Sequence, residues 1–563
     1  MESAGVIGAA SHRIGLLDKA RIIAHPGYNR WLVPPAGLAI HLCIGMAYGF
    51  SVFWKPLQGA LLGADGKPLP ECSAGAVTFA EKAVGTLKAI FATSCNWSQF
   101  DLGWMFTLFF VILGVSAALW GGWLERVGPR KAGAVAALCW GGGLLISAVG
   151  VYIHQLWLMW LGSGIIGGCG LGLGYISPVS TLIKWFPDRR GMATGMAIAG
   201  FGGGALIGSP LATLLMNHFA TPTSAGVWET FVTMGLIYFV FMMGGAFGYR
   251  LPPPGWRPEG WTPPQNSHAM ITEGHVHLKD AHKTAQFWLI WAVLCLNVSA
   301  GIGIIGAASP MLQETFGGQL FGDPSVGFAQ FTDSQKAQAA LVGAGFVGLF
   351  SLFNIAGRFF WASLSDKIGR KLTYYIFFTL GFICYASAPT LATLGWLALF
   401  AAAFCLIASM YGGGFATIPA YLADVFGTQF VGAIHGRLLT AWSTAGIVGP
   451  VIVNYMHDTR VAQGVPPDQI YHPIFYVLSG LLVAGFIANL LIRPLHKKWF
   501  MKEEEVAALQ AAERAAAAHA KSGSFGIGGG KFSAASILAW LVVLIPLGWG
   551  VWITLEKTLV LFE

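Results

Sequence analysis

An arginine inside an otherwise apolar segment carries the clearest chemistry in this sequence. Arg358 lies in NIAGRFFWASLSDKIGRK, eight residues before Asp366, which begins a charged turn. Helical geometry therefore places Arg358 about 12 Å from the end of its helix. An arginine at that depth in a bilayer costs about 2.5–3.5 kcal/mol, so it needs a polar cavity or a charged partner. We predict that Arg358 binds an anionic ligand; an ion pair that locks two helices together is the structural alternative.

Other polar side chains of the apolar segments are candidates for the same site. His41 and Tyr48 are seven residues apart and share a helix face, and Tyr175 follows a glycine-rich run. A membrane histidine can also serve only to bond a neighbouring helix. Trp442 could face lipid or line a cavity, and Arg437 lies near a helix end, where a basic residue can snorkel. We predict that these five residues line the substrate site.

The composition defines a membrane protein. Of 563 residues, 55% are hydrophobic and 10% are charged, and the mean hydropathy is +0.63. Soluble domains carry about 25% charge. Thirteen apolar stretches are each long enough to span the hydrocarbon core, for which about 20 residues suffice. They are centred near Ile40, Val111, Leu144, Gly170, Gly203, Phe239, Leu296, Gly348, Gly381, Ile407, Ile447, Leu482 and Leu544.

The halves of the chain resemble each other. Trp120, Glu125 and Gly128 match Trp361, Asp366 and Gly369 at a constant offset of 241 residues. A second block around GLGY matches one around GGGF at an offset of 240. Such repeats are typical of secondary transporters. Because the counterpart of Arg358 in the first half is alanine, the buried charge is specific to the second half.

The basic loops predict the orientation. Lys and Arg crowd the loops after the second, fourth and eighth spans, and the loops after the third, fifth and ninth spans have none. The positive-inside rule then places the N-terminus in the cytoplasm and the C-terminus outside, in a multi-pass protein of the cell inner membrane. The net charge of +8 is mostly this topology signal, and we predict no nucleic-acid binding.

Several segments lie between the spans. The predicted divisions are a cytoplasmic segment (1–30), a six-helix bundle (31–250), a Pro-rich linker (251–284), a second bundle (285–492), a tether helix (493–533) and an extra span (534–563). Of eight cysteines, only Cys72 and Cys95 leave the apolar spans, in a long outer loop. We predict that they form a disulfide, since that side is oxidising.

Other kinds of chemistry find no support in the sequence. Glycines repeat every fourth residue in two spans, which favours close helix packing, because no strand precedes them as a dinucleotide motif requires. We therefore predict no cofactor, no metal site and no enzyme activity. A non-transporting sensor and a membrane enzyme remain alternatives, but the linker and the tail are too short for a signalling domain. The spans also lack a paired base and nucleophile.

Two turns resemble the signature loops of the major facilitator superfamily. They read WLERVGPRK and SLSDKIGRK, and the blocks NRWLVPPAGLAIHLCIGMAYGFSVF and GYISPVSTLIKWFPDRRGMATGMAIAGFGGGA are similar to its oxalate/formate antiporter family. The tail is similar to small single-helix subunits found with such transporters. The resemblance implies a major facilitator fold, two six-helix bundles plus a thirteenth span. It also implies gating roles for eight loop residues: Glu125, Arg126, Gly128, Arg130, Asp366, Lys367, Gly369 and Arg370.

The resemblance also implies transport of small carboxylates by alternating access, with Arg358 binding the carboxylate. The family's oxalate carrier has a lysine in a TAK motif, where this chain has Thr440-Ala441-Trp442. One counter-charge favours formate, pyruvate or lactate over oxalate. Similar animal monocarboxylate transporters carry a proton on an aspartate where this chain has Asn354. This difference favours antiport or uniport, and proton symport, with His41 or His435 as the proton carrier, is the alternative. We expect the protein to be a monomer.

Overall fold

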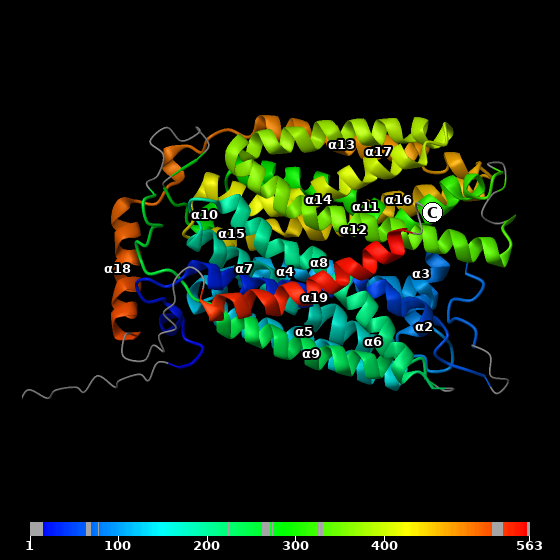
Figure 1. Cartoon of the computed structure of the whole chain (residues 1–563), viewed down its shortest axis with the longest axis horizontal. Coiled ribbons are helices and arrows are strands. Elements are labelled where there is room, and N and C mark those ends of the chain that lie inside the picture. The colour runs from blue at the N-terminus through cyan, green and yellow to red at the C-terminus, as the bar shows by residue number, and fades with distance from the viewer. Residues whose placement is uncertain are drawn as a thin grey trace, which may run out of the picture.

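The described part of the chain is helical. The computed structural model describes residues 15–63, 69–76, 78–221, 224–261, 271–272, 274–323, 326, 330–520 and 533–559. Within these ranges extended pairing is limited to isolated bridges, and the helices run side by side in one elongated body (Figure 1). Residues 1–14 of the predicted N-terminal segment and 521–532 of the predicted tether lie outside the described residues.

The first bundle is built from the helices before residue 250. They are α1 (Val33–Ile44), η3 (Gly45–Phe53), α2 (Trp54–Gln58), α4 (Gln99–Val127), α5 (Pro129–Tyr152), α6 (Leu156–Met159), η4 (Trp160–Gly167), α7 (Gly168–Trp185), α8 (Arg190–Phe219) and α9 (Val227–Gly248). α1 leads directly into η3, and α6 and η4 lead into α7, so each series forms one membrane-length element. α5 packs against α9, and α4 packs against α7.

The second bundle repeats this plan. Its helices are α11 (Ala285–Leu320), α12 (Asp333–Ile368), α13 (Arg370–Thr393), α14 (Leu397–Phe426), α15 (Val431–Leu438), α16 (Thr440–Ala462) and α17 (His472–Leu491). α13 packs against α17, and α12 against α14. The bundles meet where α8 packs on α12 and where α4 packs on α15 and α16. The predicted fold class, an all-α membrane protein of two bundles, is confirmed.

Tight glycine turns join corresponding helices in the two bundles. Gly128, between α4 and α5, has φ +87°, and Gly369, between α12 and α13, has φ +89°. A side chain in this left-handed region is strained, so only glycine fits without cost. Pro129 then begins α5 with the fixed φ that suits a first helical position. The two turns explain why the repeated sequence motif keeps its glycine.

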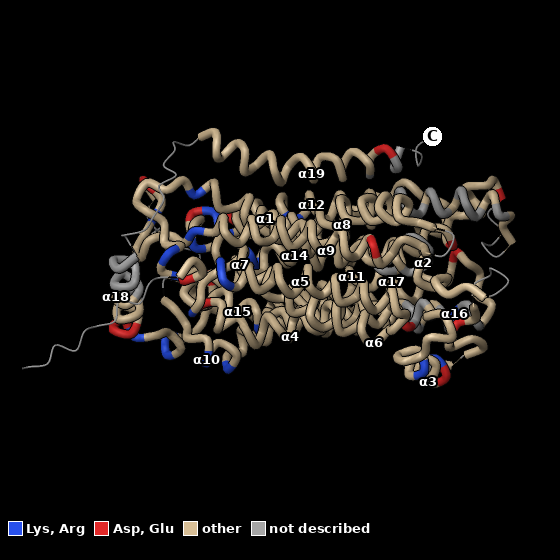
Figure 2. The backbone as a smooth tube through the Cα atoms, turned by 90° about the horizontal axis from the view of Figure 1, so that it is seen from below, with Lys and Arg blue, Asp and Glu red and all other residues tan. Residues whose placement is uncertain are grey.

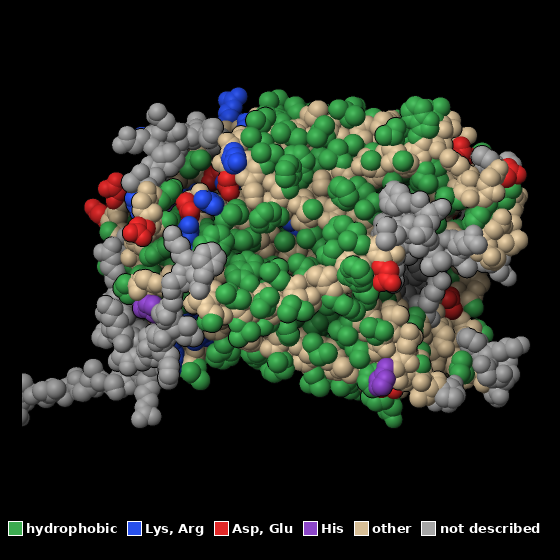
Figure 3. Space-filling model, in the orientation of Figure 1, with side chains coloured by type: hydrophobic (Ala, Val, Ile, Leu, Met, Phe, Trp, Pro, Cys, Tyr) green, Lys and Arg blue, Asp and Glu red, His purple; other side chains and the backbone are tan. Residues whose placement is uncertain are grey.

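Charged side chains mark the two ends of the body. Twelve helices in the described residues are long and apolar enough to cross a membrane. Lys and Arg gather at the end that holds the α4–α5 and α12–α13 turns, which we call the basic end (Figure 2). Apolar side chains cover the middle of the face in Figure 3. α10 (Leu278–Ala281) and α18 (Glu503–Ala520) also lie at the basic end.

The last helix, α19 (Ala534–Leu559), lies on the outside of the body. It contacts α1 and α8 of the first bundle and α12 of the second (Figure 1). Trp540 Nε1 donates to the Trp31 carbonyl at 3.1 Å. Only 17% of the most apolar stretch of α19 is buried in the protein. α19 is one of the twelve candidate spans, and α12, which packs between α8 and α14, would be the thirteenth. A total of thirteen spans stays a prediction.

A disulfide closes the loop at the opposite end. Cys72 and Cys95 are bonded, with Cα atoms 5.1 Å apart and a sequence separation of 23 residues. The loop also contains α3 (Phe79–Ala89), whose first turn is capped by Thr78 and Glu81. His154 Nε2 bonds the Cys95 carbonyl at 3.0 Å and thereby ties the loop to the end of α5.

Loss of this disulfide is expected to destabilise the protein. Closing a loop of this length restricts the unfolded chain, so Cys72→Ser with Cys95→Ser should lower the free energy of unfolding by about 3 kcal/mol. Thermal melting of the purified protein measures the effect. Cys43→Ser, at a buried unpaired cysteine, is the control for removing a thiol. Equal melting of the double variant and the wild type would contradict the prediction, as would free thiols at both positions in membrane vesicles.

Candidate substrate site

Arg358 lies between the two bundles with no solvent exposure. It comes from α12, and its Nε donates to Asn354 Oδ1 at 2.9 Å, one helical turn earlier. Its Nη1 donates across the interface to the Ile198 carbonyl of α8 at 3.1 Å. Its Nη2 has no hydrogen-bond partner among the described residues. The guanidinium is therefore held in place by two bonds while one edge keeps a free donor.

Aromatic rings enclose the guanidinium. Its Cζ lies 5.9 Å from the ring centre of Phe201 on α8 and 5.7 Å from that of Phe415 on α14. Trp442 of α16 packs on both rings, at 4.3 Å from Phe415 and 5.4 Å from Phe201. Such faces stabilise a desolvated cation. Trp442 is fully buried, so it packs inside the protein beside these rings and does not face lipid.

Two tyrosines join the bundles beside the arginine. The Tyr48 hydroxyl, from η3, lies 3.2 Å from the Tyr411 hydroxyl, from α14. Both hydroxyls are within electrostatic reach of Arg358. Sequence reasoning missed Tyr411, although it directly precedes Gly412, one of the repeat glycines. A Cβ at Gly412 would lie 3.0 Å from Arg358 Cγ, so this glycine allows α14 to approach the arginine.

Four further polar atoms, from three neighbouring side chains, have no hydrogen-bond partner among the described residues. They are the hydroxyl of Tyr175, Nε1 of Trp442 and both ring nitrogens of His435. The Tyr175 ring centre lies 5.4 Å from Trp442 and 5.8 Å from His435. Sequence reasoning noted His435 only as an alternative proton carrier. It is seven residues from Trp442 and hence on the same face, which was the available signal.

The predicted residue His41 contacts this cluster through Tyr175. Its ring stacks on Tyr175 with centres 5.2 Å apart. Nδ1 lies 2.5 Å from the Ala197 carbonyl oxygen, and Nε2 lies 3.1 Å from the Tyr175 carbonyl oxygen. His41 is thus bonded to backbone on both sides and does not present a free nitrogen to a ligand.

Arg437 does not join the cluster. Its Nη1 donates to the Leu278 carbonyl at 2.8 Å and lies 2.7 Å from His282 Nδ1, at the basic end. Arg437 and Trp442 are five residues apart, about 140° around a helix, so their side chains project in different directions. Sequence reasoning placed Arg437 in the site, and the contacts place it in the linker region.

An ion-pair network closes the basic end between the bundles. Asp424 of α14 accepts from Arg190 of α8 at 3.0 Å and from Arg370 of α13 at 3.1 Å. Asp366 accepts from Arg370 at 2.6 Å and from the backbone amides of Gly191 and Met192. These amides begin α8, where a negative charge is favoured. The network therefore ties the first bundle to the second.

The first-half signature loop makes the equivalent contacts. Glu125 accepts from Lys184 at 2.7 Å and from the Ser180 hydroxyl at 3.0 Å. Arg130 donates to the carbonyls of Leu16 and Phe247. Lys184 and Asp424 occupy the same repeat position with opposite charges. Glu125 therefore pairs with Lys184 directly, whereas Asp366 and Asp424 are joined through Arg370. That correspondence was the missed signal for Asp424.

The other signature residues do not contact the network. Arg126 and Lys367 are exposed, and Gly128 and Gly369 form the turns. The linker covers the network: Thr272 N donates to the Asp424 carbonyl, and Val276 N to the Phe426 carbonyl, both at 2.9 Å. Burial lowers the pKa of His275 in this segment, and the positive charge of Arg190 lowers it further.

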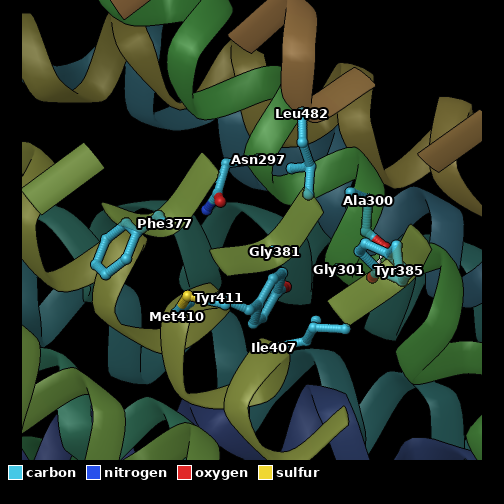
Figure 4. A pocket seen from close by; sticks show the side chains of 10 residues that line it. All are labelled: Asn297, Ala300, Gly301, Phe377, Gly381, Tyr385, Ile407, Met410, Tyr411 and Leu482. Carbon is cyan, nitrogen blue, oxygen red and sulfur yellow. Dashed lines mark hydrogen bonds between the residues drawn. The ribbon is translucent and has the colours of Figure 1, made fainter. Parts of the chain in front are cut away.

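A small cavity of about 10 Å³, room for about one water molecule, lies beside the site, inside the second bundle (Figure 4). Tyr411 separates it from Tyr48, and Tyr385 closes it by donating to the Ala300 carbonyl at 2.8 Å. Arg358 does not line it. In the described residues no group of three or more His, Cys, Asp or Glu could hold a metal ion.

Two bundles of apolar, membrane-length helices that meet at a buried polar cluster define a membrane transport protein. The chain matches the model of the Major Facilitator Superfamily over residues 72–450 and 301–562, and it belongs to that family. The predicted family is thereby confirmed, and the protein is a transporter rather than an enzyme.

Relatives and solved structures agree with this assignment. The chain is 28% identical to the oxalate:formate antiporter of Oxalobacter formigenes over 61% of its length and 73% of the relative. It is 25% identical to apicoplast pyruvate carrier 1 of Toxoplasma gondii, over 71% and 78%. It is 24% identical to monocarboxylate transporter 12 of Rattus norvegicus, over 56% and 65%.

Among solved structures, the proton:xylose symporter XylE is similar with a TM-score of 0.52 at 15% identity, over 86% of this chain and all of that one. A bacterial homologue of the iron transporter ferroportin, in an outward-facing state, is similar with a TM-score of 0.51 at 14% identity, over 82% and 99%. At these identities the likeness concerns the fold alone.

Proposed function

We propose that the protein carries small carboxylate anions across the cell inner membrane by alternating access, and that it prefers formate, pyruvate or lactate to oxalate. The observation that carries this proposal is the buried guanidinium of Arg358, whose Nη2 has no partner among the described residues. The ion-paired acids Asp366 and Asp424 lie at the basic end and already have cationic partners. An incoming carboxylate would supply the missing negative charge.

The chemistry of the surrounding groups supports an anion. Charge-assisted bonds from guanidinium to carboxylate are short and about twice as strong as neutral ones. The Tyr175 hydroxyl and Trp442 Nε1 add neutral donors that have no partner among the described residues. With one fixed cation, a monocarboxylate neutralises the site, whereas a dicarboxylate leaves one negative charge in a low-dielectric region. The printed names of the relatives, an oxalate:formate antiporter and a pyruvate carrier, are consistent with this substrate class.

The positive charge of Arg358 favours exchange of one anion for another over net transport. An empty site keeps an uncompensated cation while the bundles move, and that state is costly. A loaded site is close to neutral. Asn354 holds Arg358 through its amide oxygen and has no proton to release. We therefore propose antiport, with the basic end in the cytoplasm and the closed network at Asp424 as the gate on that side.

A ligand screen tests the proposal. The purified protein should be melted with formate, acetate, pyruvate, lactate and oxalate, because a ligand at 100 times its Kd stabilises by about 2.7 kcal/mol. Ligands that stabilise should then drive exchange of labelled formate in proteoliposomes. Glucose and glycine serve as controls, because neither is an anion: glucose is uncharged, and the ammonium group of glycine balances its carboxylate. Absence of both stabilisation and exchange for every carboxylate would refute the proposal.

A further inference from the structure

The two ring nitrogens of His41 both face backbone carbonyl oxygens. Nδ1 approaches the Ala197 oxygen of α8, and Nε2 approaches the Tyr175 oxygen of α7, at 2.5 and 3.1 Å. Carbonyl oxygens accept hydrogen bonds and cannot donate. A neutral imidazole has one N–H, so one of its nitrogens must point a lone pair at an oxygen, whereas the imidazolium donates to both. The backbone frame around His41 therefore favours the protonated ring.

The other groups around His41 oppose that proton. The ring is fully buried, which disfavours any charge, and Arg358 of α12 is a like charge within electrostatic reach. The remaining groups that face it are uncharged: the phenol of Tyr175, the Phe201 ring of α8 and His435 of α15. Burial is the largest of these effects and opposes the charge, whereas a negative charge added nearby would favour it.

His435 is a useful comparison, because within the described ranges it lacks the two backbone carbonyl partners that His41 has. It is also a fully buried histidine, but neither of its nitrogens has a partner among the described residues. No carbonyl oxygen in the described part of the chain accepts a hydrogen bond from its ring, as two do around His41. Between the two proton carriers that the sequence left open, the geometry selects His41.

We propose that His41 is a proton-dependent second cation of the substrate site. It stays neutral when a monocarboxylate binds Arg358, and it gains a proton when a dicarboxylate binds, so that either complex is electrically neutral. Arg437 cannot serve, because it contacts the linker at the basic end. This inference rests on the proposed function and extends it: dicarboxylates such as oxalate are carried with one proton, and monocarboxylates without.

The test is the pH dependence of binding to the full-length protein. Between about pH 6 and pH 8 formate and oxalate remain fully ionised. If one proton binds with oxalate, its Kd should rise about tenfold per pH unit, while the Kd of formate changes little. Calorimetry in two buffers of different ionisation enthalpy should count about one proton taken up per oxalate and close to none per formate. Equal proton counts for the two ligands would overturn the proposal.

Variants separate His41 from its neighbour. His41→Asn keeps an amide that can bond one carbonyl but cannot be charged, and it should remove the pH dependence of oxalate binding. His435→Asn, at an equally buried imidazole, should keep it. Trp442→Lys adds a fixed cation and should make oxalate binding tight without proton uptake. If His41→Asn does not fold, His41→Gln tests the same loss of charge, and a count close to zero protons per oxalate on the wild type would by itself overturn the proposal.

The possible failures are distinguishable. If oxalate binds without a proton while formate binds through Arg358, only the role of His41 is refuted. If His41→Asn retains the tenfold pH dependence, the proton resides elsewhere, and the role of His41 is likewise refuted. If neither anion binds, or if both bind equally well to Arg358→Ala, the proposed function falls and this inference falls with it.

Discussion

Arg358→Lys is expected to remove nearly all carboxylate uptake while the protein remains folded and inserted. Lysine keeps the charge but has neither the second arm that bonds Ile198 nor the free Nη2. The planar guanidinium can hold a carboxylate through two parallel bonds, which an ammonium cannot reproduce. Each bond to a charged group is worth about 1.5–3 kcal/mol. Loss of one predicts about 10- to 150-fold weaker binding.

Counterflow of labelled formate in proteoliposomes measures this effect, together with melting temperature as a check of folding. Arg358→Ala should be at least as impaired as the lysine variant. Arg437→Lys is the matched control, because Arg437 is a basic residue of the same bundle whose contacts lie in the linker region. Normal counterflow by Arg358→Ala would reject the assignment of the anchor. A severe loss in Arg437→Lys alone would move the anchor to that residue.

Much of the architecture follows from local features of the sequence. The depth of Arg358 follows from helical rise and from the charged turn that ends its helix. The glycine turns at Gly128 and Gly369 follow from the repeat, since the same residue type recurs where the chain needs a positive φ. The pairing of Cys72 with Cys95 follows because the other cysteines lie within apolar segments.

The site could be predicted only in part, because its remaining members are defined by contacts between distant helices. The bond from Tyr48 to Tyr411 depends on how η3 and α14 meet. The two carbonyls around His41 are backbone atoms, which no residue type marks. Arg437 contacts Leu278 and His282 of the linker. The sequence does not indicate that the linker folds back onto α15, so these contacts could not be predicted.

Asp424→Asn is expected to open the basic end. Its two carboxylate oxygens hold Arg190 of the first bundle and Arg370 of the second, and only 5% of the residue is exposed. Removing one partner of a buried pair typically costs about 3–5 kcal/mol, because the remaining charges lose their compensation. Arg370 keeps Asp366, so most of the loss falls on Arg190, the residue that links the bundles. The closed state should therefore lose population relative to one open at this end.

Labelling of a cysteine behind the network measures this shift. Ser180→Cys places a thiol beside Glu125, at a position that is 4% exposed in the closed arrangement. Adding Asp424→Asn should raise its labelling rate at least tenfold, since about 1.4 kcal/mol changes a population ratio by ten. Asp280→Asn is the control, because the exposed pair of Asp280 with Lys283 lies within one segment and links no bundles. Unchanged labelling with Asp424→Asn, despite normal folding, would show that the closed end is held by the contacts of Asp366 with the start of α8 and not by the Asp424 pair.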